Sequence, residues 1–136
     1  MTPEVELPSG IHEERGLIQV LIHEHKGSVV VIDTVPKVQR ANHYHKDDYH
    51  YAYIVKGSIV YYERPVGSRL IPTKYKFKAG QMFYTGPMIE HSMYFDEPTV
   101  FIAMGGKTRT REEYEEDLVR LPSLHDEYLE RSSQPT

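Results

Sequence analysis

The sequence predicts an all-β domain, an antiparallel sandwich or barrel, with one or two helices at its C-terminal end. Two observations support this fold class. Short segments rich in β-branched and aromatic residues, separated by Gly and Pro turn signals, follow one another through most of the 136-residue chain. Beyond about residue 106 the apolar residues take helical spacing instead. A chain of this length suits one domain with a single core.

The predicted strands are short and closely spaced. They cover residues 17–23, 28–35, 50–56, 58–63, 75–78, 81–84, 91–95 and 99–104, and the segment 41–57 has the pattern of two strands. We therefore divide the chain into four parts. These are an N-terminal arm (1–16), a β-barrel domain (17–105), a C-terminal helical extension (106–131) and a tail (132–136) that we expect to be disordered.

Two helices are expected in the extension. Thr110 begins a capping box, and apolar residues up to Leu121 fall on one helical face before Pro122. Ser123 is a candidate cap for a second, short helix. We interpret the acidic residues of 112–117 as the solvated face of the first helix, and we expect both helices to pack outside the barrel.

Composition and charge exclude several classes of function. There is no cysteine, which excludes disulfides, thiolate metal ligands and a cysteine nucleophile. A formal net charge of −4, without a basic stripe, argues against nucleic-acid binding. No segment approaches the roughly 20 apolar residues of a membrane helix, and the N-terminus lacks a signal-peptide pattern. We expect a cytoplasmic protein with no nucleic-acid or membrane partner.

Four histidines form the candidate site. His43 and His45 are two residues apart, so on a strand both project from one face. His50 follows after a short turn, and His91 follows a Gly-Pro turn much further along. We expect these four side chains to converge as ligands of one metal ion inside the barrel.

The chemistry of such a site follows from its ligands. Four neutral imidazoles leave the charge of a divalent ion uncompensated, so the centre would attract hydroxide, an enediolate or a carboxylate and act as a Lewis acid. Imidazole suits Fe, Ni, Zn and Cu, so the identity of this divalent transition metal stays open. The alternative is a metal-free, partly protonated acid–base cluster.

The spacing of these residues resembles the two motifs of the cupin superfamily, a group of small β-barrels. The first motif reads His43-x-His45, four residues, His50, six residues and Gly57; the second reads Gly80, five residues, Gly86-Pro87-Met88, two residues and His91. The resemblance implies a cupin-type antiparallel barrel, or jelly roll, with a metal site. The chain departs from the family at His50, where a glutamate is usual, and at Gly-Pro-Met, where Pro-x-Gly is usual.

One branch of that superfamily, the sugar-nucleotide ketoisomerases, is more similar still. The resemblance rests on Glu14-Arg15-Gly16, His43-Tyr44-His45-Lys46, Gly86-Pro87-Met88, Met93-Tyr94 and the acidic helix that follows the barrel. In that branch the paired histidines are acid and base without a metal. The additional histidines at positions 50 and 91 depart from this pattern and favour a metal.

Further residues are candidates for catalysis or substrate binding. His43, His45 and Tyr84 are candidates for moving a proton. Arg40 and Lys46 flank the first motif and could hold an anionic substrate, whereas Met93 and Phe95 could line the lumen. Each has a plain structural alternative, a surface role for the cations and a core role for the apolar residues.

Several other polar residues, and the tyrosines, have simpler interpretations. We interpret His23 and His25 as an exposed strand face, and Asp47 and Asp48 as a solvated turn. The 11 tyrosines exceed what a barrel lumen holds. An outer face rich in tyrosine is typical of a subunit interface, so we expect a homodimer.

Three classes of function remain. The first is an isomerase or epimerase acting on a small keto or hydroxy compound of carbohydrate type, through a metal-stabilised enediolate. The second is a non-haem metal dioxygenase or lyase. The third is a barrel that binds a small ligand without catalysis. The helical extension and the Gly-Pro-Met turn favour the first class.

Overall fold

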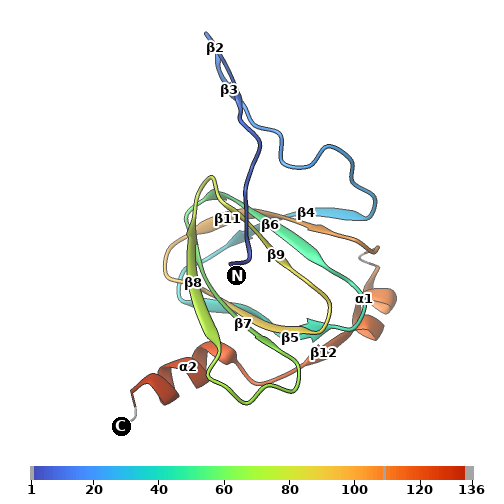
Figure 1. Cartoon of the computed structure of the whole chain (residues 1–136), viewed down its shortest axis with the longest axis vertical. Coiled ribbons are helices and arrows are strands. Elements are labelled where there is room, and N and C mark those ends of the chain that lie inside the picture. The colour runs from blue at the N-terminus through green and yellow to red at the C-terminus, as the bar shows by residue number, and fades with distance from the viewer. Residues whose placement is uncertain (1, 109, 134–136) are drawn as a thin grey trace.

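The computed structural model describes residues 2–108 and 110–133, in which two five-stranded antiparallel sheets enclose the core (Figure 1). The strands are β1 (Glu4–Val5), β2 (Ile11–Glu13), β3 (Gly16–Ile18), β4 (Ser28–Thr34), β5 (Val38–His45), β6 (His50–Lys56), β7 (Ser58–Pro65), β8 (Thr73–Lys78), β9 (Met82–Thr85), β10 (Ile89–Phe95), β11 (Thr99–Gly105) and β12 (Leu118–Arg120). The helices are α1 (Arg111–Asp117) and α2 (Leu124–Ser132). The predicted all-β class with C-terminal helices is confirmed.

The two sheets place sequence-distant strands side by side. One has the order β1–β9–β6–β11–β4 and the other β12–β5–β10–β7–β8. Every predicted strand other than 17–23 has a counterpart in these sheets, with bounds that differ by a few residues. The alternation predicted for β6 is also present, since Ala52 and Ile54 are buried in the core while Val55 is exposed.

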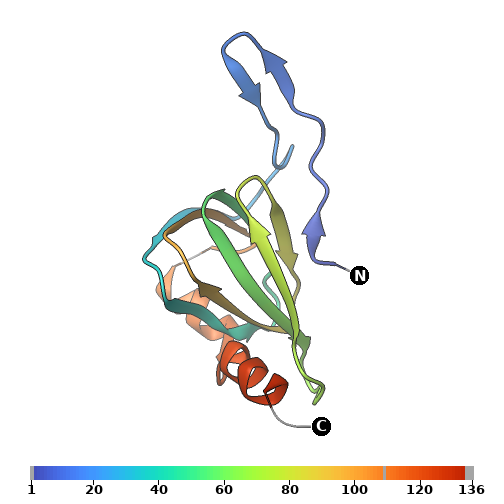
Figure 2. The same ribbon diagram turned by 90° about the vertical axis from the view of Figure 1, so that its left-hand side faces the viewer.

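The predicted strand 17–23 is wrong over most of its length. Residues 16–18 form β3, which pairs only with β2 in a hairpin that stands away from the barrel (Figure 2). His23 lies beyond β3 in an irregular segment. Conversely, part of the predicted loose arm is ordered, because β1 pairs with the barrel strand β9. Local β-propensity identified the strand but not its partner.

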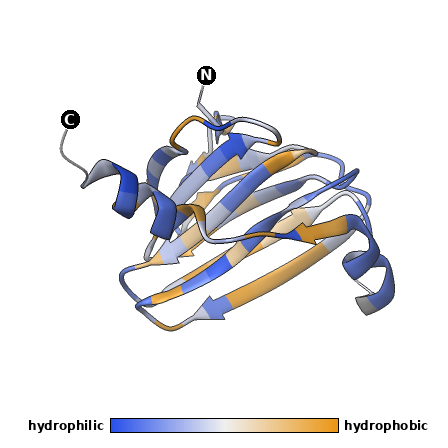
Figure 3. Ribbon diagram, turned by 90° about the horizontal axis from the view of Figure 1, so that it is seen from below, coloured by the Kyte–Doolittle hydropathy of each residue, from blue (hydrophilic) through white to orange (hydrophobic). Residues whose placement is uncertain are grey.

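Aromatic and β-branched residues fill the space between the sheets. The core includes Ile54, Ile59, Tyr61, Phe77, Phe83, Phe95 and Phe101, all almost fully buried. Hydrophilic residues dominate both helices, and hydrophobic stretches follow the strands (Figure 3). Within the described part of the chain, neither helix has the length and apolar character that crossing a membrane requires.

The first predicted helix is shorter than expected. It ends at Asp117, and residues 118–120 form β12, which adds to the edge of β5. Leu118, Val119 and Leu121 therefore continue as extended backbone rather than as an apolar helical face. The second helix agrees with the prediction, since Ser123 is its N-cap and accepts a hydrogen bond from the Asp126 N–H. Of the predicted tail, residues 134–136 lie outside the described residues.

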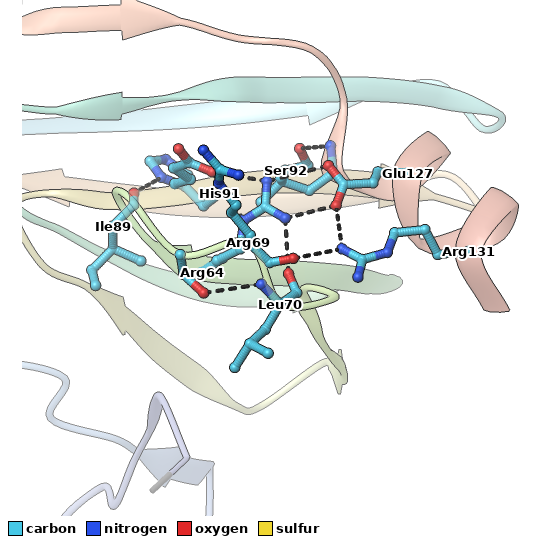
Figure 4. A network of polar contacts seen from close by, with 11 residues as sticks. Arg64, Arg69, Leu70, Ile89, His91, Ser92, Glu127 and Arg131 are labelled. Carbon is cyan, nitrogen blue, oxygen red and sulfur yellow. Dashed lines mark hydrogen bonds and ion pairs between the residues drawn. The ribbon is translucent and has the colours of Figure 1, made fainter.

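A network of charged groups fixes α2 to the sheet that carries β10 (Figure 4). The Arg64 guanidinium donates to Glu90 on β10 and to Glu127 on α2, with N–O distances of 3.1 and 2.6 Å. Arg131 also reaches Glu127, at 3.1 Å. The Leu124 N–H donates to the Ser92 hydroxyl at 2.9 Å. These contacts hold the N-terminal end of α2 against β10, the strand that presents His91, and its middle against Arg64 of β7.

Candidate functional site

A cavity of about 320 Å³ lies inside the barrel, lined by strands of both sheets and by α1. All four predicted histidines line it, which brings together residues from β5, β6 and β10. His43 and His91 are direct partners across the β5–β10 pair. The ring centroids of His43 and His91 are 4.7 Å apart, and those of His45 and His50 are also 4.7 Å apart. The four histidines therefore line one cavity, and their joint ligation of a metal ion stays a prediction.

The histidine nitrogens form two overlapping groups rather than one shell. Ligand atoms of His43, His45 and His91 lie within 4.8 Å of one another. A second group with the same spacing contains His45, His50 and Asp48. His45 belongs to both groups. A three-histidine group is therefore present, and His50 belongs to the second group with Asp48.

Hydrogen bonds at Nδ1 set the tautomer of two of these rings. His45 Nδ1 donates to Asp117 Oδ2 at 3.0 Å, because an ionised carboxylate can only accept. His91 Nδ1 donates to the carbonyl oxygen of Ile89 at 2.9 Å. In the neutral ring, Nε2 of each residue then carries a lone pair. This is the tautomer that a metal ligand or a general base requires.

The pKa values of two of these histidines keep them neutral near pH 7. Burial lowers the pKa of His43 to about 2, and the neighbouring His91, His45, His50 and Arg120 lower it further. Burial also lowers the pKa of His91 to about 4, against the opposing effect of its bond to the Ile89 carbonyl. Burial would raise the pKa of Asp117, but hydrogen bonds from Asp47 N–H, Asp48 N–H and His45 outweigh it, and the net shift is downward.

The depressed pKa of His91 predicts how stability depends on pH. The unfolded chain binds a proton at His91 below about pH 6.5, whereas the folded chain does not until about pH 4. The unfolded state therefore holds more protons in this window, and the free energy of unfolding falls as pH decreases. Urea denaturation at pH 7.5, 6 and 5 should give a shallower decline for His91→Gln than for the parent. An equal decline of the free energy of unfolding with pH in both proteins would contradict a depressed pKa at His91.

A β-bulge explains how Arg40 reaches the same cavity as His43. In the β5–β10 pair His91 faces His43, but Ser92 faces Ala41, so Asn42 is an extra residue. Ala41 and Asn42 both have positive φ, 70° and 56°, which is unusual for residues other than Gly. The bulge shifts the strand phase by one. His43 and Arg40 therefore both line the cavity, although a regular strand would place residues three apart on opposite faces.

Three residues near the histidines were not among the candidates that the sequence predicted. Asp117 had been assigned to a solvated face, but it is buried and holds His45. Arg120 is the β12 partner of His43 and lines the cavity. Tyr114 lies over the histidines, 5.5 Å from the His45 ring. The i, i+3 spacing of Tyr114 and Asp117 places both on one helical face, and that signal was available in the sequence.

Asp48 is a second correction. The sequence interpretation placed it in a solvated turn, yet its side chain is buried and accepts hydrogen bonds from the Tyr49 and Gly106 N–H groups. Its other oxygen lies 3.6 Å from His50 Nε2. Nothing in the spacing of this short polar turn distinguished Asp48 from the exposed Asp47.

Three of the predicted site residues lie elsewhere. Tyr84 points to the other side of β9, where its ring packs against Tyr49 and Tyr51. Phe95 is fully buried in the core against Phe101. Lys46 lines a separate, charged cavity beside α1. Tyr84 and Phe95 lie on strands whose side chains alternate between the two faces of a sheet. The sequence did not show which of these side chains face the cavity.

The remaining candidates are divided between the cavity and the surface. Met93 lines the cavity, as predicted, together with Arg40. The segment Glu14-Arg15-Gly16, part of the ketoisomerase resemblance, joins the strands of the protruding hairpin. His23 and His25 lie in the irregular segment before β4.

The donor set fits a transition metal. His43 Nδ1 is buried and has no hydrogen-bond partner among the described residues, and its ring lies beside those of His45 and His91. Two of the three rings of the His43, His45 and His91 group have their other nitrogen fixed by an acceptor, as is usual for metal ligands. Three histidines with open positions are also a common catalytic arrangement.

Comparison with known proteins supports the fold. The chain is similar to the sugar 3,4-ketoisomerase QdtA from Thermoanaerobacterium thermosaccharolyticum, solved with TDP, with a TM-score of 0.68 and 18% identity over 90% of this chain and 88% of that one. A 3,4-ketoisomerase from Helicobacter canadensis gives a TM-score of 0.69 and 15% identity, with 93% of each chain covered.

A third similar structure is the capsular polysaccharide assembling protein CapF from Staphylococcus aureus, with a TM-score of 0.61 and 19% identity. There the match covers 85% of this chain but only 34% of CapF. No protein-family profile matches the chain, and no curated protein matches it. At these identities the likeness establishes a shared cupin-like fold.

Proposed function

We propose that this protein is an isomerase of a nucleotide-linked keto sugar, which moves a proton between two adjacent carbons. The observation that carries the proposal is the hydrogen bond between Asp117 and His45, beside the neutral imidazoles of His43 and His91. The proposal is supported by structures of the same fold that are sugar 3,4-ketoisomerases, one of them solved with TDP-4-keto-6-deoxyglucose. A carbohydrate-type isomerase was also the first of the three classes that the sequence favoured.

The site provides one strong proton carrier. Asp117 stabilises the protonated form of His45, because its carboxylate faces the Nδ1–H of that ring. His45 Nε2 can then take a proton from the carbon that bears the hydroxyl group, and an enediolate forms toward the neighbouring carbonyl. The same imidazolium returns the proton to the former carbonyl carbon, while the hydroxyl proton moves from the first oxygen to the former carbonyl oxygen. The ketone and hydroxyl groups thereby exchange places with no net change in protons.

Neighbouring groups have supporting roles in this scheme. His43 and His91 remain neutral and leave the ionisation to His45. Tyr114 lies over the rings of His43 and His45, where its hydroxyl can hydrogen-bond a substrate oxygen. A divalent transition metal held by His43, His45 and His91 would supply Lewis-acid stabilisation of the developing oxyanion.

Two guanidinium groups give the cavity an affinity for anions. Arg40 and Arg120 line the cavity and are exposed enough to meet a ligand from solvent. A nucleotide diphosphate is an anion of suitable charge for them. We therefore propose that the substrate is anionic and that Arg40 contacts it. Lys46 does not contact it, because Lys46 lines the separate cavity.

Replacing Arg40 by methionine should raise KM for the nucleotide-linked keto sugar by about 10- to 100-fold, because the substrate loses one or two charge-assisted hydrogen bonds. The value of kcat should change much less, because Arg40 is assigned to ground-state binding. Lys46→Met is the matched control, since Lys46 lines the separate cavity. Steady-state kinetics measure both. An unchanged KM in Arg40→Met, or an equal rise in Lys46→Met, would contradict the assignment.

The proposed activity is tested with TDP-4-keto-6-deoxyglucose and protein prepared without a His-tag. Metal-stripped protein and protein loaded with Fe(II), Ni(II) or Zn(II) are followed by ¹H NMR under argon, with oxygen consumption measured in air. We expect a 3-keto product that forms without oxygen. Oxygen uptake with no anaerobic product would favour the dioxygenase class. Tight binding without turnover in any metal form would favour the ligand-binding class.

Homodimer formation remains a prediction, as does the cytoplasmic location. The half-buried cluster of Tyr49, Tyr51 and Tyr84 lies on the outer side of one sheet, as the tyrosine-based argument for an interface requires. Exposed Val29 and Val31 lie on β4 at the edge of the same sheet.

A further inference from the structure

A buried threonine of the opposite sheet holds Arg40, the cation in the cavity wall. The Arg40 Nε–H donates to the Thr34 hydroxyl oxygen, with an N–O distance of 3.1 Å. Thr34 is the last residue of β4 and Arg40 lies on β5, and these two strands belong to different sheets. Thr34 is almost fully buried, whereas Arg40 is exposed and lines the cavity. The hydrogen bond therefore fixes one nitrogen of an exposed side chain to the barrel interior.

The backbone on both sides of this hydrogen bond is held by strand pairing. Thr34 is paired with Thr99 of β11, and Arg40 lies within the paired part of β5 and β10. The short turn between β4 and β5 is also fixed, because the Lys37 N–H donates to the Phe95 carbonyl oxygen at 2.6 Å. The positions of the donor and acceptor strands are thus set before any ligand binds.

The same bond determines which nitrogens of Arg40 can take a ligand. A guanidinium presents its N–H donors in one plane, and Nε is occupied by Thr34. Nη1 and Nη2 have no hydrogen-bond partner among the residues that the structure describes. Their shared edge matches the oxygens of a phosphate or carboxylate group through paired hydrogen bonds.

The charge of Arg40 is not offset by a neighbour. Arg120, the other arginine of the cavity, is paired with Glu115 at 2.7 Å. No carboxylate of the described part of the chain pairs with Arg40. Thr34 is neutral, so it orients the guanidinium without competing with an anionic ligand for its charge. Of the two cavity arginines, Arg40 is therefore the better prepared to bind an anion.

We propose that Thr34 is a positioning residue that preorganises Arg40 to bind a phosphate group of the substrate, an inference that rests on the proposed isomerase function. The hydrogen bond restricts a long side chain before the ligand arrives, so less conformational entropy is lost on binding. Without the hydroxyl, Arg40 keeps its charge but the ligand itself must order it. Thr34 does not line the cavity, so we expect its effect on binding and not on proton transfer.

The test is isothermal titration calorimetry with TDP and with inorganic pyrophosphate, on protein without a His-tag. Thr34→Val keeps the shape of the side chain and removes the hydroxyl. It should raise both Kd values by about 3- to 10-fold, the usual effect of one lost hydrogen bond, and Thr34→Ser should restore them. In steady-state kinetics on the keto sugar, KM should rise similarly while kcat stays within about twofold of the parent.

Thr99→Val is the matched control for a purely structural effect. Thr99 is also a buried strand threonine, but its hydroxyl donates to the Ser58 carbonyl oxygen at 3.0 Å. This variant should unfold at a lower temperature and keep the Kd values of the parent. A rise in its Kd values equal to that of Thr34→Val would overturn the positioning role.

A double variant separates the positioning of Arg40 from other effects of Thr34. In the Arg40→Met background, Thr34→Val should change neither Kd, because the side chain that it positions is gone. A full further rise in Kd there would overturn the proposal. So would parent-like Kd values in a folded Thr34→Val protein, or a parent that binds neither TDP nor pyrophosphate. If the parent binds them but does not turn over the keto sugar, the proposed isomerase function fails, and the Kd values still decide the role of Thr34.

Discussion

Replacing His45 by asparagine should lower kcat by about 10²- to 10⁴-fold, the usual contribution of a general acid–base residue. His45 is almost fully buried in the cavity wall, and its Nδ1 is fixed by Asp117. Asparagine retains a hydrogen-bonding side chain toward Asp117 but cannot carry the substrate proton. Binding should change little, so KM should stay within about threefold.

His23→Asn is the matched control for this variant. His23 is exposed in the irregular segment before β4. Both variants are compared with the parent by steady-state kinetics on the keto sugar, with circular dichroism to verify the fold. If a folded His45→Asn protein keeps activity within twofold of the parent, His45 is not the proton carrier.

Asp117→Asn should reduce kcat on the order of 10³-fold while the site residues that contact the substrate remain in place. One oxygen of Asp117 accepts the Asp47 N–H at 2.8 Å, and the other accepts from His45 and from the Asp48 N–H. The asparagine oxygen can keep the first bond, but its NH2 group then faces two donors. His45 would be forced to protonate Nε2 instead of Nδ1, the wrong tautomer for a base facing the substrate.

The same substitution has two further measurable effects. The Asp48 N–H loses its acceptor, which should cost about 1–3 kcal/mol in the free energy of unfolding. Without the carboxylate, the apparent pKa of the base in the pH–kcat profile should move downward, because the imidazolium loses its stabilising charge. Glu116→Gln, one residue earlier and exposed, serves as the control. If the Asp117→Asn variant is destabilised but keeps the kcat of the parent, Asp117 has a structural role and no role in catalysis.

Much of the fold was predictable because it depends on local alternation. The strands from β4 to β11 have clear β-branched and aromatic patterns, and breakers such as Gly57 mark their ends. The position of His43, His45, His50 and His91 around one cavity was also predictable, because the spacing within the two motifs indicates which strands of a barrel lie together. The hairpin of β2 and β3 was not predictable in the same way, because its residues have strand propensity without a barrel partner.

The parts of the site that escaped prediction depend on tertiary pairing. The β5 bulge places two non-glycine residues at positive φ, and no propensity indicates this at Ala41. Residues 118–120 fit a helical face as well as a strand, and only the free edge of β5 decides for the strand. Asp117 lies at this helix-to-strand transition. Its role as the partner of His45 therefore became visible only with the pairing of β12.

In the proposed reaction, His45 transfers a proton between adjacent carbons of a nucleotide-linked keto sugar. The most direct test incubates the parent protein with TDP-4-keto-6-deoxyglucose in D2O and determines, by ¹H and ²H NMR, which carbon of the recovered sugar carries deuterium. The proposal predicts a 3-keto product that carries deuterium at C4 wherever the transferred proton has exchanged with solvent before its return, greatly reduced formation of that product in His45→Asn, and none without protein. Recovery of the sugar with no deuterium at C4 and an unmoved ketone would contradict it.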